Sequence, residues 1–150
     1  MTASLCRRST MCYVMAQTFT LRMRQDTRAA LERQAEKTRV PKTALAERYV
    51  EEGLRMDAHP GIVFRDGPAG RRAGLASGPD VWEVIMVFLD EGRSVEGTTK
   101  NLELSVRLVN AAVGYYADFR EEIDDRIESN RKAAEEAEAA WRRRQALVSD

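Results

Sequence analysis

The apolar and polar positions near the start of the chain follow two different periods, and each period predicts an element. Residues 18–23 alternate between apolar and polar side chains, which is the pattern of a half-buried strand. In residues 27–38 and 43–56 the apolar positions recur every three or four residues, as in an amphipathic helix. Asp26 directly precedes the first helical pattern and is expected to be its N-cap. The pattern therefore predicts one strand followed by two helices.

A passage rich in glycine and proline follows this segment and separates it from a second helical region. Residues 59–80 contain turn-forming residues throughout and break any helix, so we expect turns there, with His59 as a turn residue. The stretch "PDVWEVIMVFLDEGRS" at residues 79–94 then carries a strongly apolar helical pattern, which indicates a buried helix. Asp80 is placed to cap this helix and Gly92 to end it.

The remaining residues predict further helices, and the helical pattern is clearer in some segments than in others. Residues 95–104 are poorly patterned and indicate a single helical turn. After Ser105, an apolar stripe at helical spacing runs through residues 106–127 and predicts one long helix. Residues 129–150 are rich in alanine and glutamate and predict either a helix or a disordered tail.

Charge divides the chain into two regions that suit different partners. Residues 1–58 carry 11 basic and 7 acidic side chains, a net charge of +4, whereas residues 59–150 carry 13 basic and 17 acidic ones, a net charge of −4. We therefore place a domain boundary at residues 56–59. The expected organisation is a disordered leader over residues 1–15, a first domain over 16–58, a second domain over 59–128 and a charged helical or disordered tail over 129–150.

Composition disfavours several classes of protein. No apolar run approaches the roughly 20 residues of a membrane-spanning helix, and the start of the chain has no apolar core of a secretory signal. We therefore expect no membrane partner and a cytoplasmic location. Both cysteines, Cys6 and Cys12, lie in the leader, and the chain has one histidine. These residues cannot supply the four ligands of a structural zinc site, so we expect no metal and no cofactor.

The predicted strand needs a partner, because a single strand leaves its backbone hydrogen bonds unsatisfied and two short helices bury too little surface. Pairing with the same strand of a second chain would give a two-stranded antiparallel ribbon over a core of four helices. The polar side of such a ribbon, formed by Thr18, Thr20 and Arg22, fits the major groove of DNA. An edge strand within a mixed core is the alternative interpretation. The predicted dimer core consists of Phe19, Leu21, Met23, Leu31, Leu45 and Tyr49.

These residues resemble the ribbon-helix-helix repressors, the group that includes Arc and MetJ and many bacterial antitoxins. The resemblance rests on "TFTLRM" followed by "DTRAALERQAEKTRVPKTALAERYVEEGL" and covers residues 17–56. It implies base contacts from the strand and a phosphate site over residues 40–43, where free amides and the helix dipole favour an anion. The DNA-contacting residues implied in this way are Thr18, Thr20, Arg22, Arg39, Lys42 and Thr43.

The second region resembles a family of small antitoxin-like domains known as domain of unknown function 433. The matching pieces are the His-Pro-Gly start at residues 59–61, a basic glycine turn at 70–72, the Glu-Gly pair at 91–92 and "YYADFREEID" at 115–124. Members resemble helix-turn-helix or winged-helix antitoxins and are often paired with PIN-like ribonuclease toxins. The implied fold class is mainly α, with an N-terminal ribbon-helix-helix unit, a helix-turn-helix-like helical domain and a C-terminal helical tail.

The same resemblance implies that the acidic second region binds a toxin. Six carboxylates fall within residues 118–128, and Trp141 stands alone in the charged tail. As alternatives, the tyrosine pair at 115–116 belongs to a core or an interface, the acidic stretch is a solvated helix face, Trp141 packs within the chain, and "WRRRQ" contacts nucleic acid. The candidate toxin-binding residues are Tyr116, Phe119, Glu122, Asp125 and Trp141.

The sequence thus predicts an antitoxin of a type II toxin-antitoxin pair, which binds its own promoter as a homodimer and neutralises a PIN-like ribonuclease toxin. The alternative is a stand-alone ribbon-helix-helix repressor whose second domain senses a ligand or forms higher oligomers. An enzyme is disfavoured, because Asp118, Asp124 and Asp125 are predicted on one helix, whereas metal nucleases need carboxylates that converge from several elements. We therefore expect no catalytic residues.

Overall fold

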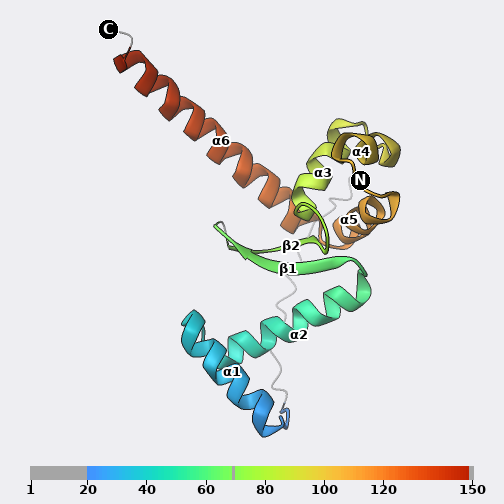
Figure 1. Cartoon of the computed structure of the whole chain (residues 1–150), viewed down its shortest axis with the longest axis vertical. Helices are drawn as coiled ribbons and strands as arrows, with labels where there is room; N and C mark the ends of the chain where they lie inside the picture. The colour runs from blue at the N-terminus through green and yellow to red at the C-terminus, as the bar shows by residue number, and fades with distance from the viewer. Residues whose placement is uncertain (1–19, 69, 149–150) are drawn as a thin grey trace, which may run out of the picture. The chain divides into compact units, whose positions relative to one another are not determined.

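The computed structural model describes residues 20–68 and 70–148 and is mainly helical (Figure 1). Within these ranges it contains six helices and one antiparallel sheet of two strands. The described residues up to Leu45 form one compact unit, and those from Ala46 onwards form another. This division lies earlier in the chain than the boundary expected at residues 56–59, because most of the helix that ends at Ala58 belongs to the second unit.

The first unit contains α1 (Gln25–Thr38) and the start of α2 (Lys42–Ala58). α1 ends at Arg39, whose φ of 56° turns the chain, and α2 begins after Pro41. Proline suits this position, because the first amides of a helix have no intrahelical acceptor. None of the residues of α1, all of which the structure describes, is buried in this single chain. The predicted pair of helices is confirmed, and α1 keeps an apolar stripe that its own chain does not bury.

The prediction that Asp26 caps the first helix is wrong. The Arg28 amide donates to the carbonyl of Arg24 at 3.0 Å, so the helix already begins at Gln25 and Arg24 is its N-cap. Asp26 consequently lies in the first turn of α1. A carboxylate in the first turn still favours the helix, because the N-terminal end of the helix dipole is positive.

The predicted strand is not formed in the part of it that the structure describes. Residues 20–24 have no regular secondary structure, and Thr18 and Phe19 lie outside the described residues. A strand satisfies its backbone hydrogen bonds beside another strand, and a ribbon built from two chains cannot form within one. The order of elements in the described chain is therefore helix first.

The second unit contains a β-hairpin where the sequence predicted only turns. β1 (Ile62–Gly67) and β2 (Gly70–Leu75) pair in antiparallel register, with Ile62 opposite Leu75. The prediction of turns throughout residues 59–80 is therefore wrong. The run of Ile, Val and Phe that opens β1 favours a strand, and the glycine and proline at positions 67 and 68 favour a turn directly after it. These local preferences outweigh the effect of the glycines.

The hairpin packs against α3 (Val81–Asp90) and α5 (Val106–Asp118), and α4 (Val95–Leu102) packs against these two helices. The predicted start of α3 after Asp80 is confirmed, and the helix ends at Asp90, shortly before Gly92. At its start the Glu83 carboxylate accepts a hydrogen bond from the Asp80 amide at 2.7 Å. α4 is longer than the single turn predicted there. The cap explains the difference, since the Ser94 hydroxyl accepts from the Gly97 amide at 3.0 Å and satisfies an otherwise free donor.

The hydrophobic core of the second unit lies between these helices and the hairpin. Tyr115 is fully buried and Tyr116 nearly so, which places both in the core rather than at a free surface. The buried core residues are Ile62, Ala73, Leu75, Val81, Val84, Ile85, Val109, Ala112, Tyr115, Tyr116 and Ile123.

The single long helix predicted over residues 106–127 is interrupted at Phe119. α5 ends at Asp118, Phe119 has φ −123° and ψ 45°, and α6 (Arg120–Val148) begins at the next residue. The ring centroid of Phe119 lies 4.6 Å from that of Tyr115 and 5.8 Å from that of His59, so the break is accompanied by aromatic packing.

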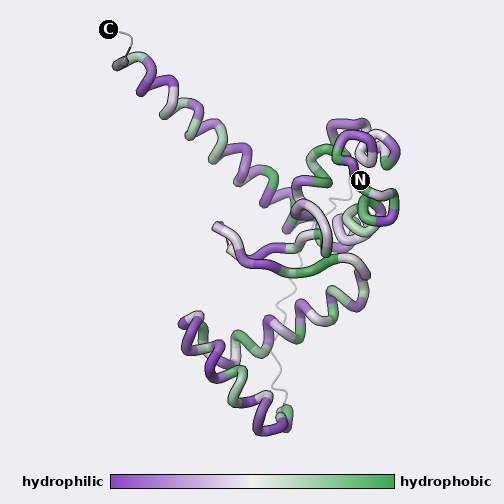
Figure 2. Tube along the Cα trace, in the orientation of Figure 1, coloured by the Kyte–Doolittle hydropathy of each residue, from purple (hydrophilic) through white to green (hydrophobic). Residues whose placement is uncertain are grey.

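α6 continues through the described part of the tail, so of the two predictions for the tail the helix is confirmed there. Figure 2 shows that α3 is mostly hydrophobic, whereas α6 is mostly hydrophilic. The two helices therefore have different environments: α3 is a core element, and most of α6 faces solvent.

Candidate functional site

The residues predicted to contact DNA are exposed as far as the structure describes them. Thr20 and Arg22 lie in the segment before α1, and the predicted strand partner Thr18 is not described. Arg39 stands between α1 and α2, and Lys42 and Thr43 form the first turn of α2. The turn between the helices thus brings these last three residues together. The base-contacting set remains a prediction.

The start of α2 has features of an anion site. The Leu45 amide makes the first i to i−4 bond of this helix, to the Pro41 carbonyl at 2.9 Å. The amides of residues 42–44 precede this bond and have no such acceptor among the described residues. Lys42 adds a positive charge, and its Nζ lies 3.3 Å from Oε1 of Glu32. The Glu32 carboxylate therefore offsets part of that charge.

The residues predicted to form a dimer core differ in burial. Leu45 is fully buried, and Leu31 is half-buried. Leu21, Met23 and Tyr49 are 55%, 38% and 41% exposed, while Phe19 lies outside the described residues. Leu21 and Met23 belong to the first unit and Tyr49 to the second, so the predicted dimer core remains a prediction.

A buried carboxylate links the hairpin of the second unit to α3. Asp80 accepts from Nε of Arg65 at 2.9 Å through one oxygen and from Nε of Arg72 through the other. Burial acts to raise the pKa of Asp80, but the hydrogen bonds from Arg72 and Arg65 outweigh burial and lower it. Each guanidinium group lies against the backbone of a glycine: a Cβ at Gly67 would overlap Arg72, and a Cβ at Gly74 would overlap Arg65. The glycines therefore allow two arginines to reach one carboxylate.

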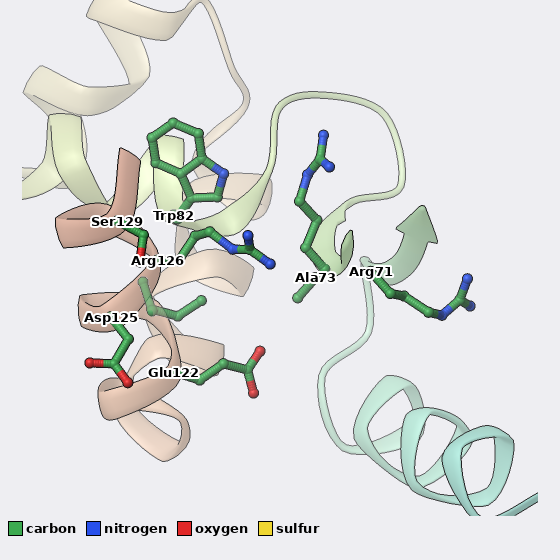
Figure 3. Close-up of a pocket in the computed structure, with 9 residues that line it drawn as sticks. Arg71, Ala73, Trp82, Glu122, Asp125, Arg126 and Ser129 are labelled. Carbon is green, nitrogen blue, oxygen red and sulfur yellow. The ribbon is translucent and has the colours of Figure 1, made fainter. Parts of the chain in front are cut away.

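Two neighbouring cavities lie beside this ion pair. The first, of about 330 Å³, is lined from β2, α3 and α6, and Figure 3 shows Glu122, Asp125 and Arg126 on α6 beside it. The second, of about 500 Å³, shares Arg72, Trp82 and Arg126 with the first. Side chains of both charges line the two cavities, and Arg72 is already paired with Asp80.

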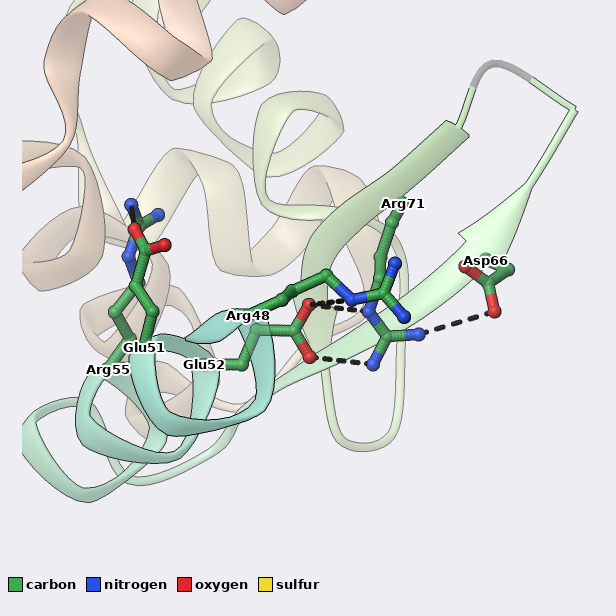
Figure 4. A network of polar contacts seen from close by, with 6 residues as sticks. All are labelled: Arg48, Glu51, Glu52, Arg55, Asp66 and Arg71. Carbon is green, nitrogen blue, oxygen red and sulfur yellow. Dashed lines mark hydrogen bonds and ion pairs between the residues drawn. The ribbon is translucent and has the colours of Figure 1, made fainter. Parts of the chain in front are cut away.

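A second buried carboxylate joins α2 to the hairpin (Figure 4). Glu52 accepts from Arg71 at both oxygens, with distances of 2.5 Å from Nε to Oε1 and 2.7 Å from Nη2 to Oε2. Arg71 also donates to Asp66 at 3.3 Å, and Nε of Arg48 lies 3.8 Å from Oε1 of Glu52. The hydrogen bond to Glu52 is the largest influence on the pKa of Arg71 and raises it. This bidentate pair fixes the hairpin against the second half of α2.

Arg55 connects α2 to α5 and α6. Its Nη1 donates to the Tyr115 hydroxyl at 3.0 Å and to Oε2 of Glu122 at 2.6 Å, and its guanidinium lies 4.2 Å from the Phe119 ring centroid. The Tyr115 hydroxyl donates in turn to Oε1 of Glu122 at 3.1 Å. Burial is the main cause that raises the pKa of Tyr115 to about 12. The contacts explain why three helices meet at the break between α5 and α6.

His59, predicted to be a turn residue, follows directly after α2 and precedes the hairpin. Its Nε2 lies 3.2 Å from Oδ2 of Asp118, and its ring packs edge-on against Tyr115. The side chain thus takes part in tertiary packing as well as in the turn.

Most of the predicted toxin-binding residues make contacts within the chain. Tyr116 is buried and donates to Oδ1 of Asp124 at 2.8 Å, while Phe119 is half-buried under Arg55. Glu122 is paired with Arg55, although part of it remains exposed. Asp125 and Trp141 are exposed on α6. Only these last two, among the candidates, offer a largely free side chain in the described structure.

Within the described residues, no group of three or more His, Cys, Asp or Glu side chains is close enough to hold a metal ion. Over the same ranges, no helix is both long and apolar enough to cross a membrane. Ser129 lines the first cavity, and no histidine is among the described residues of that lining.

Sequence reasoning missed the arginine–carboxylate pairs of the hairpin. The signal for the hairpin was the run of Ile, Val and Phe at residues 62–64, followed by glycine and proline at 67 and 68. In the hairpin Arg65 and Arg72 lie opposite each other, and Asp80 follows a few residues after β2. An assigned hairpin would therefore have indicated that both arginines lie near Asp80. The partner of Arg71 had no such signal, because Glu52 lies on a separate helix.

Comparison of the chain with protein-family models, curated proteins and solved structures found no match.

Proposed function

We propose that the protein is a dimeric DNA-binding antitoxin, which binds its operator through the N-terminal segment and neutralises a PIN-like ribonuclease toxin through the second unit. The observation that carries the proposal is the set of exposed apolar side chains at and after an alternating segment. Leu21 and Met23 stand at alternate positions and are exposed, as a strand awaiting its copy from a second chain requires.

Pairing of two such segments would cover these apolar side chains and leave Thr18, Thr20 and Arg22 on the opposite face of a ribbon. A ribbon of two strands fits the major groove, where Arg donates to guanine and Thr contacts base edges or thymine methyls. The exposed amides at the start of α2, with Arg39 and Lys42 beside them, would hold a backbone phosphate.

The toxin-facing part of the proposal rests on the charge and exposure of the second unit. Residues 59–150, which make up most of this unit, carry a net charge of −4, and Asp125 and Trp141 remain exposed on α6. An exposed indole is a frequent anchor in protein interfaces, because it buries a large apolar area at small entropic cost. The helices α3, α4 and α5 give this unit its own core, so it can present such a surface independently of the ribbon.

A stand-alone repressor is the second candidate, and the two cavities of the second unit favour it. Both cavities are lined by Trp82 and by side chains of both charges, which a sensing domain would use to bind a small polar molecule. This candidate keeps operator binding and replaces the toxin with a small molecule.

Replacement of Leu21 by Asp tests the ribbon. A charge buried in the proposed interface should abolish both dimerisation and operator binding, as measured by sedimentation equilibrium and gel shift. Val106→Asp is the matched control, because Val106 is exposed to a similar degree, 53% against 55%, on α5. A Leu21→Asp chain that dimerises like the control would rule out the ribbon.

Replacement of Arg22 by Ala tests base recognition. We expect a loss of about 1 to 3 kcal/mol at the operator and a relaxed base preference at one position. Arg24→Ala is the neighbouring control, because strand alternation would place Arg24 on the same side but at the end of the ribbon. An equal loss on all DNA sequences would instead identify Arg22 as a phosphate contact.

Co-expression with the product of the neighbouring open reading frame tests toxin neutralisation. Copurification and relief of growth inhibition are expected, and Trp141→Ala should weaken both, while Val106→Asp should leave them intact. A neighbour that neither binds nor inhibits growth would favour the stand-alone repressor.

A further inference from the structure

The second half of α2 turns its charged side toward its own unit. In residues 46–58 the side chains that are not exposed are Ala46 and three charged ones, Arg48, Glu52 and Arg55. These three follow one another at steps of four and three, which places them on one side of the helix. This arrangement is the reverse of a helix that packs by hydrophobic burial. The large apolar side chains of the same stretch are all exposed: Tyr49, Val50, Leu54 and Met56.

The hydrophobic core of the second unit does not include α2. Within the described residues, the buried core side chains and the apolar side chains packed against them all come from Ile62 or later positions. The hydrogen bonds that hold α2 run instead from Arg71 to Glu52 (Figure 4) and from Arg55 to side chains of α5 and α6. Loss of these bonds would therefore leave the core contacts of the unit in place.

Contacts of this kind allow a segment to open locally. A segment held by few buried apolar contacts opens at a lower free energy than the whole domain unfolds. The side chains of Arg55 and Glu122 are 21% and 41% exposed, so salt screens their attraction. The side chain of Glu52 is only 9% exposed and accepts from Arg71 at both oxygens, so this pair is the main restraint on opening.

The closed helix places Arg55 in a site for a guanidinium group. Its guanidinium carbon lies 4.2 Å from the Phe119 ring centroid. Its Nη1 donates to the Tyr115 hydroxyl at 3.0 Å and to Oε2 of Glu122 at 2.6 Å. An aromatic face, a hydroxyl acceptor and a carboxylate are groups that bind an arginine side chain. Arg55 thus occupies the site as an internal ligand, and it covers two of the residues predicted to bind a toxin, Phe119 and Glu122.

We propose that Glu52 and Arg55 form a latch, which holds α2 over this site in the closed chain and offers the site to an arginine side chain of a partner protein when it opens. The partner's guanidinium then replaces that of Arg55 at Phe119 and Glu122, so the site holds a cation in both states. The core stays folded, because α2 is not part of it. The identity of the partner as the toxin rests on the proposed function, whereas the latch does not.

Amide hydrogen exchange in the full chain tests the latch. The Leu21→Asp chain is used, so that a second chain does not cover α2 in the proposed dimer. A released helix of this length is unstable in water, so its amides exchange with solvent. We expect the amides of residues 46–58 to be less protected than those of α3 and to depend less on urea, because opening exposes little surface. Equal protection and equal urea dependence of the two segments would overturn the latch.

Glu52→Gln in the same chain should release the helix. It removes the charge that Arg71 holds and should increase the exchange of residues 46–58 about 30-fold. Glu47→Gln is the matched control, because Glu47 is an exposed carboxylate on the same helix and the change of charge is the same. Equal exchange in the two variants would show that Glu52 does not hold the helix and would overturn the latch.

Glu122→Gln separates the latch from the site that it covers. Glu52→Gln and Glu122→Gln each remove one negative charge and one contact of α2, but only Glu122→Gln also removes the carboxylate of the site. A tetra-arginine peptide, titrated by calorimetry, should bind the Glu52→Gln chain more tightly than the chain without it, because the site is open more often. The Glu122→Gln chain should bind the peptide about tenfold more weakly than the Glu52→Gln chain. Equal binding by these two variants would overturn the proposed site.

The product of the neighbouring open reading frame extends the comparison to the toxin. It should bind the Glu52→Gln chain more tightly than the Glu122→Gln chain. A peptide that prefers Glu52→Gln, together with a neighbour that binds neither variant, would contradict the toxin as partner and support the latch. A neighbour that binds both variants equally would overturn the role of this site and leave the proposed function in place.

Discussion

Asp80→Asn should destabilise the second unit, because it removes the charge that compensates two arginines. The Asp80 side chain is 6% exposed and accepts from Arg65 and Arg72. A hydrogen bond to a charged group contributes about 1.5 to 3 kcal/mol. Asparagine keeps one acceptor and the shape of the side chain, but it leaves both guanidinium groups without a compensating charge.

The expected loss of free energy of unfolding is smaller than that of two fully buried pairs. The side chains of Arg65 and Arg72 are 39% and 23% exposed, so solvent screens the charges that Asp80→Asn leaves behind. We expect a loss of about 2 kcal/mol, which lowers the melting temperature of a domain of this size by roughly 10 °C. Asp80→Ala should cost about 1 kcal/mol more, because alanine cannot act as the N-cap of α3.

Urea unfolding of the full chain, followed by Trp82 emission in a Trp141→Phe background, measures this loss close to the ion pair. Asp90→Asn is the matched control, because Asp90 is an exposed carboxylate at the other end of α3. The reasoning would be wrong if Asp80→Asn and Asp90→Asn unfolded at the same urea concentration.

The pH dependence of the same difference follows from the lowered pKa of Asp80. A carboxyl group whose pKa is lower in the folded state stabilises the fold above its unfolded pKa, near 3.8, and loses this effect as pH falls through the lower folded value. The gap between the wild-type chain and Asp80→Asn should therefore be constant near neutral pH and narrow below about pH 4. A gap that stayed constant to the lowest pH would show that the charge of Asp80 is not responsible.

Three further changes test other contacts of the second unit. Glu52→Gln should lower the stability of the hairpin by about 2 kcal/mol, measured by urea unfolding, because it removes the charge held by Arg71. The pKa of Tyr115 is raised to about 12, so an absorbance titration should lack one tyrosine transition near pH 10. In Tyr115→Phe the number of transitions should match the number of tyrosines that remain. The stability due to the Tyr115 phenol is present below pH 10 and is lost as pH rises toward 12. Gly74→Val should displace the Arg65 guanidinium and reproduce part of the Asp80→Asn loss, and the two changes together should cost less than their sum.

The sequence predicts best those elements whose apolar period and caps agree. α3 has both an apolar helical pattern and Asp80 at its start, and its start agrees with the prediction. The α1–α2 pair was likewise visible from its period, although the N-cap was misplaced at Asp26. Local signals of this kind need no knowledge of the rest of the chain.

The errors arise where tertiary contacts or glycines override local signals. The helix break at Phe119 lies inside an uninterrupted helical period, and only the aromatic packing with Tyr115 and His59 distinguishes it. The hairpin was hidden by its glycines, whose role is to admit the side chains of Arg65 and Arg72. The aromatic packing and the space beside the glycines both depend on residues distant in the sequence, so a short stretch of neighbouring residues does not reveal them.

In the N-terminal segment the local pattern is clear, but the two-stranded ribbon that it predicts needs two chains. A strand at residues 18–23 needs another strand to pair with, and the one sheet of the described residues contains only β1 and β2. Leu21 and Met23 are exposed for the same reason, since the described part of the chain places no apolar surface over them. Exposed apolar residues at alternate positions are costly in water unless a partner covers them. The absence of a strand in a single chain and the proposal of a ribbon in a dimer are therefore consistent, and the oligomeric state of the Leu21→Asp chain distinguishes the ribbon from an unpaired segment.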